Sequence, residues 1–100
     1  MTAFIITHDL IETGSKGTMG PSSLSQADEA RLQSGEGIAF RLLDDDRQVY
    51  YKGRRLAVSS VTEDYDSEDE LAPLDCFGGP NAGCTIQEEK NKDGKWESIN

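Results

Sequence analysis

The chain has 100 residues, the size of one domain, with 19 acidic against 10 basic residues and a formal net charge of −9. This balance excludes a protein that grips nucleic acid through clustered Lys and Arg. A chain of this charge either stays in solution by itself or binds a basic partner. We expect residues 1–100 to form a single domain.

The N-terminal residues have the pattern of a short strand followed by a loop. Residues 3–7 are apolar and β-branched, and residues 12–22 are rich in Gly, Ser and Thr, which predicts a mobile loop. The opening lacks a basic region before its apolar run, so we expect neither a signal peptide nor a membrane span. Two cysteines without a secretory signal indicate a reducing, cytoplasmic location.

A short helix is predicted after this loop. Ser23 and Ser25 are both candidate N-caps, and Ser23 has Gln26 three residues later, as in a capping box. Gly35 suits the C-terminal stop. Because apolar residues are few, we expect the helix to end near residue 34 and to lie on a sheet along a narrow stripe.

Residues 38–56 predict a β-hairpin with its turn at residues 44–47 and with Leu43 opposite Gln48. This register sets one face to the core, because slipping it by one residue would place Leu42 against Gln48. The predicted buried residues are Phe40, Leu42, Val49 and Tyr51. The residues predicted to be more exposed are Arg41, Tyr50 and Lys52.

The C-terminal half begins with an acidic segment. Residues 60–78 hold seven acidic side chains and no Lys or Arg, and we expect residues 62–71 to form a mobile loop. Residues 71–83 predict a structured loop held to the core by Leu71, Leu74 and Phe77. Residues 84–88 and 95–99 predict strands joined by the turn Asn-Lys-Asp-Gly. The expected fold is therefore α+β, a small antiparallel sheet of four or five hairpin-connected strands with one short helix.

A divalent-metal site is one interpretation of the acidic segment. Asp64, Asp66 and Glu68 occupy positions one, three and five of a calcium-loop pattern, and Asp75 falls at position twelve. Position six is Asp69 where the loop needs glycine. A solvated acidic loop is therefore the favoured interpretation, and a divalent-metal-binding or small regulatory protein is the alternative.

Other chemistry finds little support in the residue patterns. Cys76, Cys84 and His8 lack the close Cys pairs of zinc sites, so we expect reduced thiols, no bound metal and no cofactor. His8 precedes Asp9, but no nucleophile-elbow motif accompanies them. We therefore expect a protein that is not an enzyme.

The densest charges predict a partner-binding surface. In an extended segment, alternate carboxylates stand about 6.6 Å apart, and duplex DNA carries one charge per ~3.4 Å of each strand. A folded acidic edge approaches that density and would compete for a basic nucleic-acid channel. The predicted partner-binding residues are Asp44, Asp45, Asp46, Asp64, Asp66, Glu68 and Glu70. We expect no direct binding of nucleic acid and no membrane contact.

Three runs carry a resemblance: FRLLDDDRQVYYKGR, PLDCFGGPNAGCT and a late Gly-Lys-Trp. Over residues 40–54 and 73–96 the chain is similar to small acidic uncharacterised proteins of bacteria and their mobile elements. In size and charge alone it resembles the phage anti-CRISPR inhibitors, which occupy a surface of the CRISPR effector. The resemblance implies a non-enzymatic inhibitor whose acidic face docks on a basic surface of a host defence complex.

Overall fold

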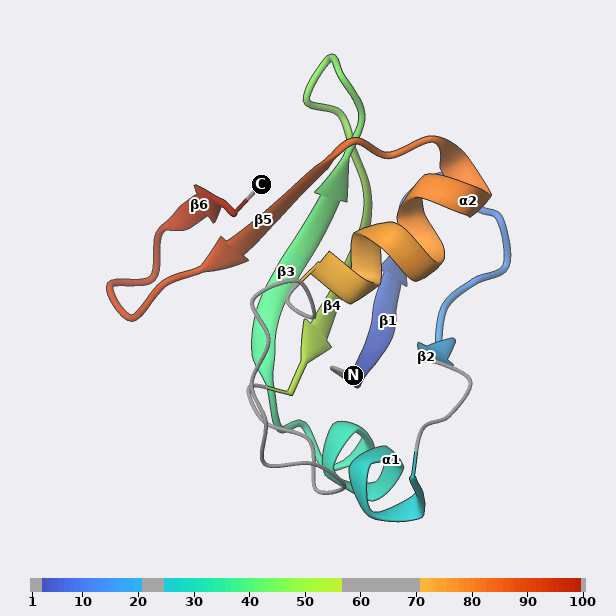
Figure 1. Ribbon diagram of the computed structural model, residues 1–100, viewed down its shortest axis with the longest axis vertical. Helices are drawn as coiled ribbons and strands as arrows, with labels where there is room; N and C mark the ends of the chain where they lie inside the picture. The colour runs from blue at the N-terminus through green and yellow to red at the C-terminus, as the bar shows by residue number, and fades with distance from the viewer. Residues whose placement is uncertain (1–2, 21–24, 57–70, 100) are drawn as a thin grey trace.

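The computed structural model describes residues 3–20, 25–56 and 71–99, which contain a six-stranded sheet (Figure 1). The strands are β1 (Phe4–Asp9), β2 (Met19–Gly20), β3 (Ile38–Leu43), β4 (Val49–Arg55), β5 (Ile86–Lys90) and β6 (Trp96–Ser98). Their order is β2-β1-β4-β3-β5-β6, and every neighbouring pair is antiparallel. The predicted antiparallel α+β architecture is confirmed.

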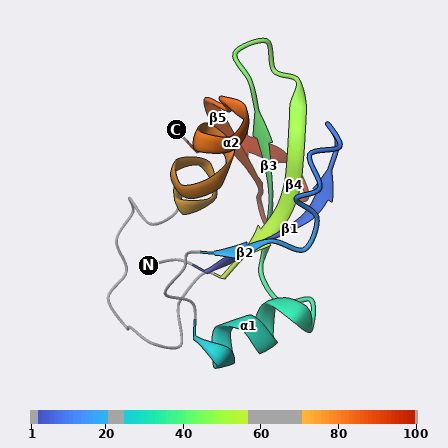
Figure 2. The ribbon, with the colours of Figure 1, turned by 90° about the vertical axis from the view of Figure 1, so that its right-hand side faces the viewer.

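The helices lie on different parts of this sheet. A π-helical turn η2 (Leu74–Gly78) continues into α2 (Gly79–Ala82) and covers one face, whereas α1 (Gln26–Gln33) lies at the end where β1 begins (Figure 2). Ser25 is the N-cap of α1, and its hydroxyl accepts a hydrogen bond from the Asp28 N–H at 3.1 Å. The other candidate cap, Ser23, lies outside the described residues.

The expected element count was wrong in two places. β2 has only two residues, too few for a periodic pattern, so a sixth strand escaped prediction. Residues 71–83 were assigned to a loop because of their Gly and Pro content, yet they are helical. Pro80 lies in the first turn of α2, and Gly83 ends the helix at φ 69°.

The hairpin register differs from the predicted one by two residues. Phe40 lies opposite Gly53 and Leu42 opposite Tyr51, and a bulge at Tyr50 then brings Leu43 opposite Val49. A shift of two preserves the faces, so the prediction that Phe40, Leu42 and Tyr51 are buried is confirmed. Val49 is half-buried instead, because the bulge interrupts the alternation before it.

The close packing around Gly53 explains the observed register of β3 and β4. A Cβ at this position would lie 2.1 Å from the Ile5 carbonyl oxygen and 2.6 Å from the Phe40 ring. Only glycine therefore lets β4 fit between the β1 backbone and the Phe40 side chain that crosses above it.

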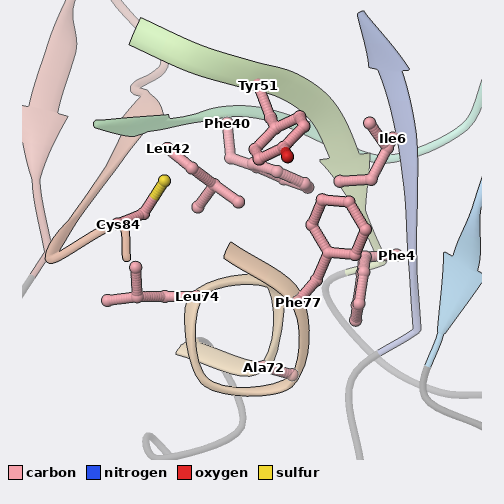
Figure 3. Packing of buried hydrophobic residues seen from close by; sticks show 9 residues of the cluster. All are labelled: Phe4, Ile6, Phe40, Leu42, Tyr51, Ala72, Leu74, Phe77 and Cys84. Atoms are coloured by element: carbon pink, nitrogen blue, oxygen red, sulfur yellow. The ribbon is translucent and has the colours of Figure 1, made fainter. Parts of the chain in front are cut away.

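The main core lies between the sheet and the η2 and α2 segment (Figure 3). The Tyr51 and Phe77 rings meet edge to face with their centroids 4.8 Å apart. Leu74 and Phe77 are buried, which confirms their predicted role as core anchors, and Leu71 packs at the margin of the same core. A second, smaller cluster joins α1 to the sheet and consists of Ala3, Ile5, Leu32 and Leu56.

Candidate docking site at the acidic turn

The turn between β3 and β4 carries Asp44, Asp45 and Asp46, which we call the acidic turn. Asp44 holds it together, because its Oδ1 accepts hydrogen bonds from the N–H groups of Asp46 and Gln48, each at 2.9 Å. Its Oδ2 accepts a 2.8 Å hydrogen bond from the Tyr50 hydroxyl. The Gln48 N–H and the Tyr50 hydroxyl lower the Asp44 pKa below its ordinary value. These hydrogen bonds define the path of the turn, and the lowered pKa keeps Asp44 ionised at neutral pH.

The other two carboxylates of the acidic turn are exposed at its tip. Asp45 accepts a 2.6 Å hydrogen bond from the Thr85 hydroxyl. Arg47, the base beside the turn, instead directs its Nη1 to Glu88 Oε2 at 3.2 Å. Among the described residues, no ion pair involves an aspartate of the acidic turn. Its negative charge therefore faces the solvent without neutralisation.

Two apolar side chains lie at the same end of the sheet. Leu10 and Ile11 keep 50% and 39% of their surface exposed, and they are the large exposed hydrophobic residues of the described part of the chain. The Leu10 N–H donates to the Tyr50 carbonyl at 2.9 Å, so these side chains lie next to the start of β4. An apolar pair beside an acidic turn has the composition of a protein-binding surface, with an apolar centre and a polar rim.

Asp9 orders the loop that displays this apolar pair. Its carboxylate accepts hydrogen bonds from the Ile11 N–H (3.2 Å), the Thr13 hydroxyl (2.8 Å) and the Ser15 N–H (2.8 Å). Partial burial opposes ionisation of Asp9, but hydrogen bonds led by the one from Ser15 outweigh it and lower the pKa from 3.8 to about 2. These hydrogen bonds define the path of the loop from Asp9 to Ser15, and the mobility expected for residues 12–22 stays a prediction.

Sequence reasoning missed this role of Asp9. The adjacent His8 drew attention to a catalytic dyad, whereas the His8 Nδ1 contacts the Thr7 hydroxyl at 2.9 Å. The signal that could have revealed it was an aspartate followed within six residues by Thr, Gly and Ser, because aspartate accepts hydrogen bonds from nearby backbone in turns.

The remaining predicted site residues, Asp64, Asp66, Glu68 and Glu70, lie outside the described residues. The structure therefore places only the acidic turn. Asp75, the last position of the calcium-loop pattern, is exposed on η2. Within residues 3–20, 25–56 and 71–99, the His, Cys, Asp and Glu side chains form no group of three that could hold a metal ion.

The two cysteines do not form a disulfide. Cys84 is buried beside Leu42 and Leu74 (Figure 3), whereas Cys76 is exposed on η2. Burial, with a smaller effect of the Asp44 charge, raises the Cys84 pKa to about 11. Because the thiolate is the nucleophilic form, Cys84 is a packing residue rather than a nucleophile.

A cleft of about 640 Å³ opens between β3 and the β5–β6 hairpin. Its acidic side chains, Glu89 and Glu97, both have partners. Glu89 pairs with Arg55, and Glu97 accepts a 2.6 Å hydrogen bond from Asn91 Nδ2. Neither His nor Cys is among the described residues that line the cleft.

Comparisons with family models, curated proteins and solved structures give no match to this chain. No helix within the described ranges has the length and apolar content to cross a membrane.

Proposed function

We propose that this chain is a non-enzymatic binding protein whose acidic turn docks on a basic surface of a partner. The observation that carries the proposal is the hydrogen-bonded acidic turn, which has no neutralising base among the described residues. Asp44 locks the turn, Asp45 and Asp46 project from it, and Arg47 pairs with Glu88 instead. A fixed anionic tip steers association with a cationic surface and sets its orientation.

The apolar pair supports the same surface. Charged contacts at the rim of an interface contribute mainly to the rate of association, whereas buried apolar anchors contribute most of the affinity. Leu10 and Ile11 supply such anchors, and hydrogen bonds to Tyr50 and Asp9 hold their backbone in place. The hydrogen bonds that Asp9 accepts favour one path of the loop before binding, which lowers the conformational entropy lost on docking.

The concrete form of the proposal is a phage or mobile-element inhibitor of a nucleic-acid-handling defence complex, of the anti-CRISPR type. A basic nucleic-acid channel is a suitable target, because it is built to accept closely spaced negative charges. The net charge of −9 and the carboxylates of the acidic turn meet this requirement. Contact with an effector would then block nucleic acid by occupancy, with no chemical step.

The test measures binding and inhibition of purified CRISPR effector complexes at low and high salt. The double variant Asp45→Asn/Asp46→Asn removes two charges and keeps Asp44, which holds the turn. We expect slower association for this variant, and the difference should shrink as salt rises, because the Debye length is only ~8 Å at physiological ionic strength.

The matched control is Glu29→Gln/Asp93→Asn, which removes the same charge from α1 and from the β5–β6 turn. Equal loss in both double variants would mean that net charge alone drives binding. If no effector bound the wild-type chain at low salt, the inhibitor proposal would fail.

A further inference from the structure

The sheet face opposite the main core carries a second charged surface. Side chains alternate between faces along a strand, so Arg41 and Lys52 point away from the face on which Phe40 and Tyr51 meet η2. The small cluster around Leu32 covers this opposite face where β1 begins and β4 ends, and its margin is next to Arg54, the cross-strand partner of Ile5. In Figure 2 the η2 and α2 segment lies on one side of the sheet alone. We define the basic face as Arg41, Lys52, Arg54 and Lys90, together with Glu88 and Trp96.

Positive charge on the basic face exceeds negative charge. Arg41 lies directly opposite Lys52 on the neighbouring strand, an arrangement of like charges that destabilises a sheet. Glu88 is the acid beside them, and two guanidinium groups contact it: Arg41 Nε at 2.5 Å and Arg47 Nη1 at 3.2 Å. One carboxylate therefore balances two arginines.

The other bases of the basic face have no carboxylate partner among the described residues. Arg54 Nη1 donates to a neutral acceptor, the Glu36 carbonyl, at 3.3 Å. Within the described part of the chain, Lys52 and Lys90 take part in no ion pair. A chain of net charge −9 thus concentrates uncompensated cations on one sheet face. Such a face is complementary to an anion.

The position of Trp96 bears on whether the anion is a carboxylate or a phosphate of nucleic acid. The Arg41 Cζ lies 4.5 Å from the centroid of the Trp96 ring, so the guanidinium occupies a ring face on which a nucleobase would stack. The net charge of −9 repels any polyanion, but it repels nucleic acid, with a phosphate at every nucleotide, more than a segment whose carboxylates alternate with uncharged residues. The observations therefore favour carboxylates over phosphates as ligands.

We propose that the basic face is a docking surface for an extended acidic segment, rich in Asp and Glu, of a partner protein. Lys52 and Arg54 are two residues apart on β4, so their side chains emerge from the same face about 6.6 Å apart. Alternate side chains of an extended peptide have the same spacing. The surface and the partner differ from those proposed for the acidic turn, so either proposal can be wrong while the other holds.

Trp96 is the only tryptophan of the chain, and its fluorescence reports on this face directly. The probe is a synthetic decapeptide of alternating Asp and Ser, with an Asn/Ser decapeptide and an oligothymidylate titrated in parallel. We expect a saturable change in Trp96 fluorescence with the Asp peptide only, weaker at high salt because the contacts are charged.

The variant Lys52→Gln/Arg54→Gln should reduce affinity for the Asp peptide about tenfold, since it removes two charges from the contact surface. The control Lys92→Gln/Lys95→Gln removes the same charge from the β5–β6 turn and should bind like the wild type. Thermal melts confirm that both variants fold. An absent response at low salt, equal loss in the control, preference for the oligonucleotide, or self-association of the chain in sedimentation would each overturn the proposal.

Discussion

Arg55 and Glu89 form an ion pair on the core face of the sheet, across the intervening strand β3. The guanidinium contacts the carboxylate through two nitrogens, with Nη2 2.7 Å from Oε1, and both side chains are at least nine-tenths buried. Gln87 extends the pair, since its Nε2 donates to Glu89 and its Oε1 accepts from the Leu74 N–H at 3.1 Å. This chain of contacts ties the first residue of η2 to the sheet.

Breaking one side of this pair should destabilise the fold strongly. Glu89→Ala leaves the Arg55 charge buried without its partner, and we expect a loss of about 3–5 kcal/mol in the free energy of unfolding. Denaturant titration followed by circular dichroism measures it. Asp93→Ala, an exposed acid, is the control and should stay within about 0.5 kcal/mol of the wild type. A Glu89→Ala protein as stable as the control would mean that the pair is not buried as described.

Substitution of Phe40 tests which face of the hairpin is buried. Its side chain is fully buried beside Phe4, with ring centroids 6.4 Å apart, so Phe40→Ala should cost about 3–5 kcal/mol. Leu10→Ala removes an apolar side chain of which half is exposed and should have a far smaller effect. Thermal melts compare the melting temperatures of the two variants. Similar melting temperatures would contradict the assignment of the buried face to Phe40.

The sequence predicted the hairpin faces better than the hairpin register. Alternation of apolar residues marks Phe40, Leu42 and Tyr51 for burial in either register, because the two registers differ by an even number of residues. The bulge at Tyr50 is accompanied by a hydrogen bond from the Tyr50 hydroxyl to the Asp44 carboxylate, a contact that no periodic pattern encodes.

The candidate site was predictable only in part. The run of three aspartates was plain in the sequence, but its distinct roles were not, because they depend on which backbone N–H groups each carboxylate meets. The basic face was harder to predict still. Its members come from β3, β4, β5 and β6, and only the pairing of those strands brings them together.

The cysteines should differ in reactivity. Cys76 is exposed, whereas Cys84 is buried and has a pKa of about 11. Because alkylation requires the thiolate and access to it, iodoacetamide at mildly alkaline pH should modify Cys76 quickly and Cys84 only after unfolding. Mass spectrometry of peptides over a time course separates the two sites. Equal rates in the native protein would show that the core around Cys84 is open.

The stability of the loop that Asp9 holds should depend on pH. The Asp9 pKa is lowered from 3.8 to about 2 in the folded state, so the folded chain holds this proton less tightly than the unfolded chain. The resulting stabilisation is fully present above pH 3.8 and is lost as the pH falls towards 2. The protection of the amides of residues 10–17 against exchange, relative to unstructured peptides at the same pH, should therefore decrease between these limits. In Asp9→Asn no carboxylate titrates at this position, so the loop should exchange faster already at neutral pH and show a flatter pH dependence.

The control is Asp93→Asn, which removes a carboxylate from the exposed β5–β6 turn and should keep the wild-type profile. A wild-type loop whose protection stayed constant down to pH 2 would contradict the role assigned to Asp9.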